Sequence, residues 1–181
     1  MFGPIGPDEL GYVHSSSPSD TTYGPVDDDP VDAPLSDELA AAVAGARRRA
    51  VRDGDRQIDT AHLLHSLLES DPEVRAACAD GGQLARLLGY LVQRSIGYGL
   101  RWQGSVEDSG AVPVVRSGAP GWSQVATAAL TAGVARAAAR GGGPARGLDV
   151  FAALVEDPRC RAVEVLDRAG IDVQDLRTAL N

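Results

Sequence analysis

The stretch Ile-Asp-Thr-Ala-His-Leu-Leu-His-Ser-Leu-Leu, residues 58–68, decides the fold of this chain. Its leucines recur at the three- and four-residue spacing that places apolar side chains on one face of a helix: Leu63, Leu64, Leu67 and Leu68. The spacing predicts a helix that begins at Asp59 or Thr60. Asp71-Pro72 is expected to end this helix and start another, because proline fits the first turn of a helix.

Further helices are predicted on both sides of this stretch. Before it, Ser36 is a suitable N-cap, and apolar residues continue at helical spacing as far as Ala50. Arginines followed by Gly54 mark the end of that helix, because cations and glycine suit a helix C-terminus. After the proline, Gly81-Gly82 is expected to break the chain before a fourth helix, which carries Leu84, Leu87, Leu88, Leu91 and Val92.

The same pattern returns in the last third of the chain. Ser123 follows Ser36 at an offset of 87 residues, and Asp157-Pro158 follows Asp71-Pro72 at an offset of 86. The sequence therefore predicts two tandem four-helix repeats. The first helix of each repeat has small residues at every fourth position, which allow close packing on a neighbouring helix: Ala42, Ala46 and Ala50, then Ala129, Gly133 and Ala137.

The order and spacing of these residues resemble the Clp R domain, the double Clp-N motif of Clp-type ATPases. In that family each repeat opens with an aromatic residue and a threonine, and Ile-Gly-Thr-Glu-His later begins a leucine-rich helix. Here Leu35-Ser36 and Trp122-Ser123 stand at the opening positions, and residues 58–62 read Ile-Asp-Thr-Ala-His. Ala169-Gly170-Ile171 matches the Leu-Gly-Ile type of sequence that follows the third helix of a repeat.

The resemblance implies the fold and its boundaries. It predicts an all-α protein in which two tandem four-helix Clp-N-like repeats form a pseudo-twofold bundle. Repeat 1 is expected at residues 35–96, a linker at 97–121 and repeat 2 at 122–181. Residues 1–34 carry seven acidic residues and are rich in Pro, Gly and Ser, so they are predicted to be a disordered tail. Val112–Val115, within the linker, is too isolated to build a sheet.

The resemblance also implies a function. In the family this domain binds proteins and peptides without catalysis. The chain is therefore expected to bind protein or peptide ligands, including hydrophobic cyclic peptides, as an adaptor or as a decoy for ligands of a Clp unfoldase. Some family members capture phosphoarginine through the glutamate of Thr-Glu-His, but here residue 61 is alanine and the second repeat reads Gly147-Leu148-Asp149, which argues against that ligand. The candidate contact residues are Leu35, Ser36, Trp122 and Ser123, and Trp122 suits either core packing or ligand contact.

Composition excludes several other functions. All 17 basic residues are arginine, and the absence of lysine rules out a P-loop and a Schiff-base enzyme. No Ser-His-Asp or Cys-His set has recognisable spacing, so no enzyme and no cofactor are predicted. Residues 35–181 have a net charge of −1, which disfavours nucleic acid. The arginine cluster from Arg47 to Arg56 still leaves a nucleic-acid-binding regulator as the alternative, with Arg47 and Arg48 as candidate contacts.

Three smaller predictions concern location, thiols and metals. The chain has neither a run of about 18 apolar residues nor a secretory signal, so a cytoplasmic location without a membrane span is expected. Cys78 and Cys160 are expected to be reduced thiols. His62, His65 and Glu69 share a helix face at metal-like spacing, but no fourth ligand is identifiable, and no metal site is predicted.

Overall fold

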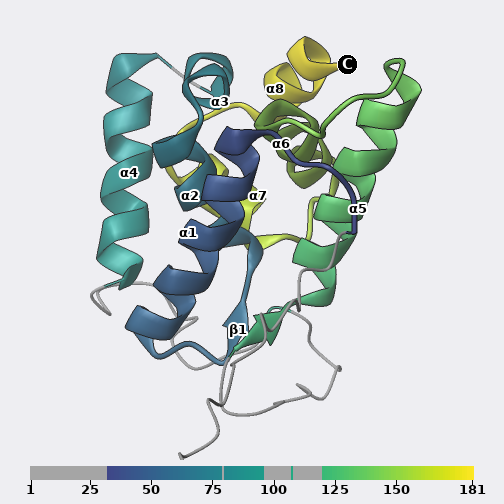
Figure 1. The fold of residues 1–181 in the computed structure, drawn as a ribbon. Helices are drawn as coiled ribbons and strands as arrows, with labels where there is room; N and C mark the ends of the chain where they lie inside the picture. The colour runs from purple at the N-terminus through teal and green to yellow at the C-terminus, as the bar shows by residue number, and fades with distance from the viewer. Residues whose placement is uncertain (1–31, 79, 96–106, 108–119) are drawn as a thin grey trace, which may run out of the picture.

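The structure is a computed structural model that describes residues 32–78, 80–95, 107 and 120–181. The first half of the chain forms α1 (Asp37–Asp53), β1 (Gln57–Ile58), α2 (Thr60–Ser70), α3 (Pro72–Cys78) and α4 (Gly81–Ser95). The second half forms β2 (Gly121–Trp122), α5 (Gln124–Ala139), α6 (Gly147–Glu156), α7 (Arg161–Arg168) and α8 (Val173–Leu180). Figure 1 shows the two sets of helices packed into one bundle.

The predicted all-α fold with two four-helix repeats is confirmed, and the same type of N-cap begins both repeats. The Ser36 hydroxyl accepts a hydrogen bond from the Leu39 amide at 3.2 Å, and the Ser123 hydroxyl accepts one from the Ala126 amide at 3.0 Å. Gly54 ends α1 in the left-handed region, at φ 70°. The capping signals read from the sequence therefore fix where α1 and α5 begin.

The predicted break before the fourth helix is present, but it lies slightly earlier than expected. α3 ends at Cys78, and Gly81 and Gly82 both lie in the first turn of α4. The Asp80 carboxylate accepts a hydrogen bond from the Gln83 amide at 2.8 Å and so begins the helix just before the glycines. A capping side chain at residue 80 thus compensates for the low helix propensity of glycine.

Several predictions fall largely outside the described residues. The predicted tail is described only at residues 32–34, the predicted linker only at residues 107, 120 and 121, and Val112–Val115 is not described. Among the described helices, none combines the length and the apolar character that crossing a membrane requires.

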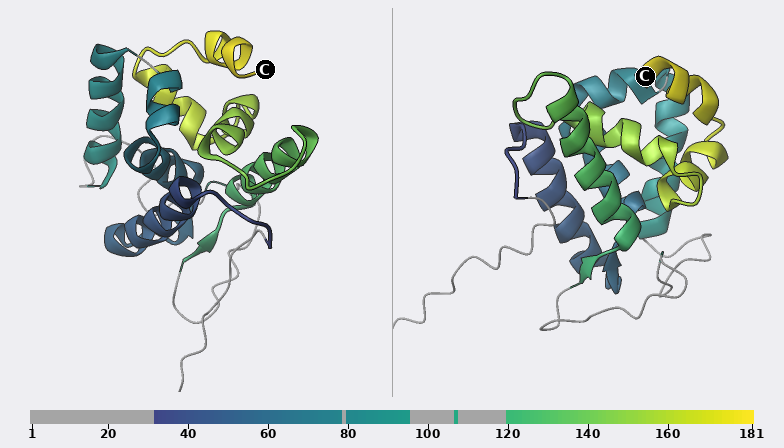
Figure 2. Two further views of the ribbon diagram at one scale, coloured as in Figure 1. Left: turned by 45° about the horizontal axis from the view of Figure 1, so that its top comes forward. Right: turned by 90° about the vertical axis from the view of Figure 1, so that its right-hand side faces the viewer.

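The centre of the bundle is formed by α2 and α6. Every residue of α2 from Thr60 to Leu68 is buried, and Phe151 of α6 is among the largest fully buried side chains. The first helix of each repeat packs along this centre, α1 on α2 and α5 on α6, and the right-hand view of Figure 2 faces both outer helices. Gly133 of α5 lies so close to Val150 that a Cβ at this glycine would come within 2.5 Å of the valine side chain.

Two short parallel pairings of extended segments join the repeats. β1 and β2 pair in parallel, with Gln57 opposite Gly121 and Ile58 opposite Trp122. An isolated parallel bridge joins Leu35 to Ala145 in the same way. The segment that opens each repeat therefore pairs with the segment before the second helix of the other repeat. This reciprocal pairing gives the bundle its pseudo-twofold arrangement. It brings the starts of α2 and α5 together at one place and the starts of α1 and α6 together at another.

Candidate functional site

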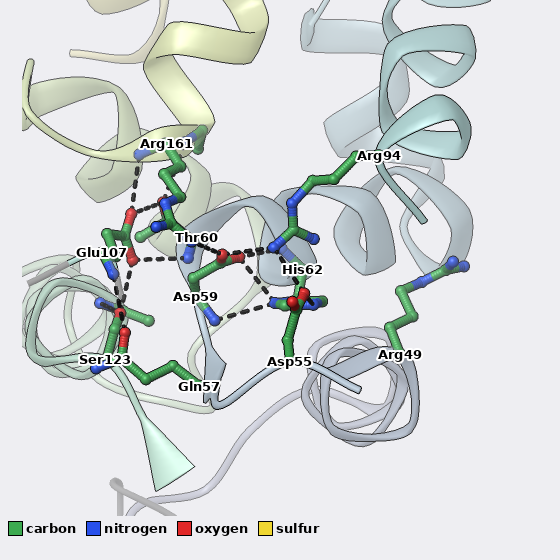
Figure 3. A network of polar contacts seen from close by, with 12 residues as sticks. Arg49, Asp55, Gln57, Asp59, Thr60, His62, Arg94, Glu107, Ser123 and Arg161 are labelled. Carbon is green, nitrogen blue, oxygen red and sulfur yellow. Dashed lines mark hydrogen bonds and ion pairs between the residues drawn. The ribbon is translucent and has the colours of Figure 1, made fainter. Parts of the chain in front are cut away.

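A carboxylate from residue 107 occupies the junction of the repeats, where the N-termini of α2, α5 and α7 meet (Figure 3). Glu107 accepts hydrogen bonds from the Thr60 amide at 3.0 Å, the Ser123 hydroxyl at 2.7 Å and the Arg161 amide at 2.8 Å. The Thr60 hydroxyl also donates to it, and the Glu107 amide donates to the Gln57 side chain at 2.9 Å. Because helix N-termini carry partial positive charge, this junction is built to hold an anion.

Next to this carboxylate lies a buried network of charged side chains centred on Asp59. The Asp59 carboxylate is 2.6 Å from Arg94 of α4 and 2.6 Å from Arg161 of α7, so it ties both repeats together. Burial alone would raise the pKa of the Asp59 carboxyl, but His62, Arg94 and Arg161 outweigh burial and hold that pKa well below its ordinary value. Asp59 is therefore a fixed negative charge inside the bundle.

His62 lies between two carboxylates. Its Nδ1 is 2.8 Å from Asp59 Oδ1, and its Nε2 is 3.0 Å from Asp55 Oδ2. Burial opposes protonation of the ring, but Asp55 and Asp59 outweigh burial and raise the pKa of His62 above its ordinary value. Arg94 also reaches Asp55, at 3.1 Å. These contacts fix the orientation of the imidazole, and none of them presents a nucleophile or a general base to a cavity.

The sequence did not single out the residues that organise this junction. Glu107 lies in the predicted linker, while Arg94 and Arg161 read as ordinary helix residues. One signal was present: Asp59 stands where the resembling family has the glycine of Ile-Gly-Thr-Glu-His. A carboxylate that is followed closely by a buried histidine points to a polar interior at this place.

The predicted contact residues lie at the two places where the repeats pair. Trp122 and Ser123 lie at the junction with Glu107, whereas Leu35 and Ser36 lie at the separate pairing with Ala145, where α1 begins. Ser36 and Ser123 cap helices, and Ser123 is fully buried. Leu35 and Trp122 are partly buried, and each is paired with the other repeat. The indole Nε1 of Trp122 is buried and has no hydrogen-bond partner among the described residues. These four residues therefore hold the repeats together, and Leu35 and Trp122 keep part of their surface exposed.

The arginine cluster of α1 is largely engaged within the molecule. The guanidinium of Arg47 lies over the ring of Trp122, 5.7 Å from its centroid, in a cation–π contact. Arg49 pairs with Glu69, and Arg52 pairs with Asp53 at 3.0 Å. Arg48 is exposed on the same helix. Arg56 is exposed as well. Three of the five arginines of the cluster are therefore held by contacts within the molecule.

An open pocket lies on the outer face of repeat 2, between α5 and the turn from α6 to α7. It has a volume of about 400 Å³ and a mostly apolar wall. Charged groups at residues 156, 157 and 159 surround the wall. The pocket was not predicted, although the exposed alanines of α5 are a signal for it. Its wall includes Ala128, Ala129, Ala132, Ala153, Leu154 and Pro158.

The two cysteines are buried free thiols, in agreement with the prediction. Burial raises the pKa of Cys78 to about 12 and that of Cys160 to about 11. Because the thiolate is the reactive form, neither residue is set up for nucleophilic or redox chemistry in the folded chain.

Comparisons with known proteins support the fold. No protein-family model and no curated protein sequence matches the chain. Among solved structures, the Hsp104 N-terminal domain from Candida albicans is similar at a TM-score of 0.60 and 15% identity, covering 81% of this chain and 89% of that one. The N-terminal domain of the caseinolytic protease-associated chaperone ClpD from Arabidopsis thaliana is similar at 0.60 and 17%, covering 81% and 91%.

A third similar structure comes from a study of a malarial protein secretion system, at a TM-score of 0.57 and 13% identity, covering 81% of this chain and 91% of that one. Identities this low establish the fold alone. The resemblance that the sequence shows to Clp domains is thus confirmed at the level of architecture, and this chain has the fold of the Clp and Hsp104 N-terminal domains.

Proposed function

We propose that this chain is a non-catalytic module that binds protein or peptide segments, acting as an adaptor or as a decoy for ligands of a Clp unfoldase. The observation that carries the proposal is the open apolar pocket beside α5, in a fold shared with chaperone N-terminal domains. Its volume of about 400 Å³ suits one or two apolar side chains of an extended segment. Trp122, which lies just before α5 and outside the pocket lining, is the proposed aromatic anchor for a ligand that extends beyond the pocket.

The polar surroundings of the pocket fit a peptide better than a small apolar molecule. Glu156, Asp157 and Arg159 lie around a wall of alanine, leucine and proline side chains. Arg159 is exposed. Its guanidinium bonds Asp157 at 3.2 and 3.3 Å, and its other N–H groups can donate to a carbonyl or a carboxylate of the ligand. Phosphoarginine is not the proposed ligand, because neither glutamate of the family motif is present.

The test is a binding titration of the full chain with a fluorescently labelled unfolded model protein and, separately, with a hydrophobic cyclic peptide. Ala132→Trp fills the pocket and is expected to weaken binding at least about tenfold. Ala138→Trp is the matched control, because Ala138 is exposed on the same helix and outside the pocket. Equal affinity of the two variants, or no binding by the natural chain, would rule out this site.

Adaptor and decoy roles predict opposite effects in a reconstituted Clp degradation assay. An adaptor raises the rate at which a substrate is degraded, whereas a decoy lowers it as its concentration rises. The Ala132→Trp variant is expected to lose either effect, which links the outcome to the pocket. An unchanged degradation rate at saturating concentrations of the chain would exclude both roles.

A further inference from the structure

Three side chains that are suited to binding a metal ion meet where α1 ends and α2 begins. α1 ends at Asp53, Gly54 reverses the chain at φ 70°, and Asp55 then returns toward His62 on α2. One ligand atom from each of these three residues lies within 4.8 Å of the other two. A tetrahedral ion with bonds of about 2.0–2.2 Å holds its ligand atoms about 3.3–3.6 Å apart, so modest rotations of the aspartate side chains would bring these atoms to one ion.

Two of these side chains have buried atoms without a hydrogen bond. Among the described residues, Asp53 Oδ2 and His62 Nε2 have no hydrogen-bond partner. The side chain of Asp53 is 6% exposed and that of His62 is 1% exposed. Asp55 approaches Nε2 to 3.0 Å without the alignment of a hydrogen bond. Buried polar atoms are normally satisfied, but within the described part of the chain Asp53 Oδ2 lacks a partner, and His62 Nε2 has only the ion-pair contact with Asp55.

The surroundings of His62 match those of a metal-bound histidine. Its Nδ1 lies 2.8 Å from Asp59 Oδ1, so a ring protonated at Nδ1 donates to that carboxylate and leaves the Nε2 lone pair for a metal. Metal-bound histidines commonly donate their other ring N–H to a carboxylate in this way. In the other tautomer Nδ1 accepts from the Asp59 amide at 3.1 Å, and the proton on Nε2 is then the one that a metal displaces.

The local charge also favours a cation. With His62 neutral, the largely buried charged side chains here are three carboxylates and two guanidiniums, a net charge of −1: Asp53, Asp55 and Asp59 against Arg94 and Arg161. Arg52 is 60% exposed and contacts Asp53 Oδ1 at 3.0 Å, leaving Oδ2 unpaired. Arg94 bonds Asp55 Oδ2 at 3.1 Å, so Asp55 shares one guanidinium with Asp59.

We propose that Asp53, Asp55 and His62 form a binding site for a divalent transition-metal ion of the zinc class. Zinc binds both histidine nitrogen and carboxylate oxygen, whereas calcium and magnesium favour sites built from oxygen alone. The ion joins the C-terminus of α1 to the first turn of α2, and its fourth ligand is water. His62 thus belongs to a metal site together with two aspartates before α2, in place of the set with His65 and Glu69.

The test uses the full chain, freed of metal by a chelator and titrated with Zn²⁺ against a chromophoric indicator. The expected result is one ion per chain. Asp53→Asn and His62→Gln are each expected to weaken binding at least about tenfold. His65→Gln is the matched control, because His65 lies on the same helix outside the ligand set, and it is expected to leave the affinity unchanged. Co²⁺ substitution supplies a visible spectrum that reports nitrogen and oxygen ligands.

Circular dichroism of each variant separates loss of the site from loss of the fold. Asp53→Asn keeps the shape of the side chain and removes only its charge, so it tests the site even where His62→Gln does not fold. The proposal fails if the natural chain binds no stoichiometric ion. It also fails if folded Asp53→Asn binds as tightly as the natural chain, or if His65→Gln loses the ion, which would place the ion at His65 and Glu69.

Discussion

At the scale of single residues, the polar interior of this domain is organised by Asp59. Asp59 is the N-cap of α2, and its carboxylate accepts a hydrogen bond from the His62 amide at 3.0 Å. The same carboxylate pairs with two arginines from different repeats. A buried ion pair of this kind contributes less to net stability than its contacts suggest, because desolvation opposes it. Its loss is costly for another reason: the partner charges stay buried without a counter-charge.

We therefore expect Asp59→Asn to lower the free energy of unfolding by about 3–5 kcal/mol, because Arg94 and Arg161 would remain buried without their carboxylate. Urea unfolding followed by circular dichroism measures the change. Asp167→Asn, at an exposed position on α7, is the control and should change stability by less than about 0.5 kcal/mol. Equal effects of the two substitutions would contradict a central role for Asp59.

His65 is expected to make the stability of the domain depend on pH. Burial, with a smaller effect of Arg49, lowers the pKa of His65 to about 4. In the unfolded chain the ring titrates near 6.5, so the unfolded state binds more protons between these values. The free energy of unfolding should therefore fall as the pH falls from about 6.5 to about 4, by at most about 3 kcal/mol. His65→Gln should remove this part of the dependence in unfolding measurements at about pH 7 and about pH 4.5.

The buried thiols should be unreactive in the native state. Because burial raises the pKa of Cys78 to about 12 and of Cys160 to about 11, almost no thiolate exists at neutral pH. Alkylation followed by mass spectrometry should show no modification of the folded chain and two modified residues in denaturant. Fast alkylation of the folded chain would show that these helices open readily.

At the scale of elements, the sequence signals that succeeded are local ones. Ser36, Ser123 and Pro72 stand at helix starts, where their side chains or ring geometry act within one turn, so their effect is readable from neighbouring residues. The break before α4 was predicted, but its position was placed at Gly81 and Gly82, because the capping of the helix by Asp80 was not recognised. The pairing of β1 with β2 was not predicted, because segments of two residues are too short to show a periodic pattern.

The packing of α5 on α6 depends on Gly133. A Cβ there would lie 2.5 Å from the Val150 side chain and 3.1 Å from its backbone. Gly133→Ala should therefore destabilise the fold by about 1–3 kcal/mol, because the helices must separate. Gly89→Ala on α4 is the control: no atom lies within 4 Å of the added carbon, and the gain in helix propensity should stabilise the fold by about 0.5–1 kcal/mol. Thermal unfolding measures the melting temperature of both variants. A change of the same sign in both melting temperatures would contradict the prediction.

At the scale of the whole molecule, the candidate site could not be read from the sequence because it joins residues from distant segments. Glu107 contacts Thr60, Ser123 and Arg161, which begin three separate helices. Nothing within the sequence near residue 107 marks it, since its role comes entirely from where those helices start. The pocket beside α5 also depends on tertiary packing, because α6 and the turn that follows it supply most of the wall.

Glu107→Ala should destabilise the domain by about 2 kcal/mol, because it leaves several buried donors at the junction unsatisfied. Added acetate or phosphate should raise the melting temperature of this variant more than that of the natural chain, since either anion can occupy the vacated position. Glu164→Ala is the control: Glu164 forms a partly exposed pair with Arg168 on α7, and its loss should cost less than about 0.5 kcal/mol without anion rescue.

The reciprocal pairing of Leu35 with Ala145 and of Ile58 with Trp122 has a consequence for the history of the domain. A half-length chain with one repeat would have both segments but no second repeat to receive them, and two such chains would satisfy each other about a twofold axis. In the present molecule, two repeats of one polypeptide pair as the two subunits of a symmetric dimer would. Gene duplication and fusion convert such a concentration-dependent assembly into a fold that forms at any concentration, and each half is then free to diverge.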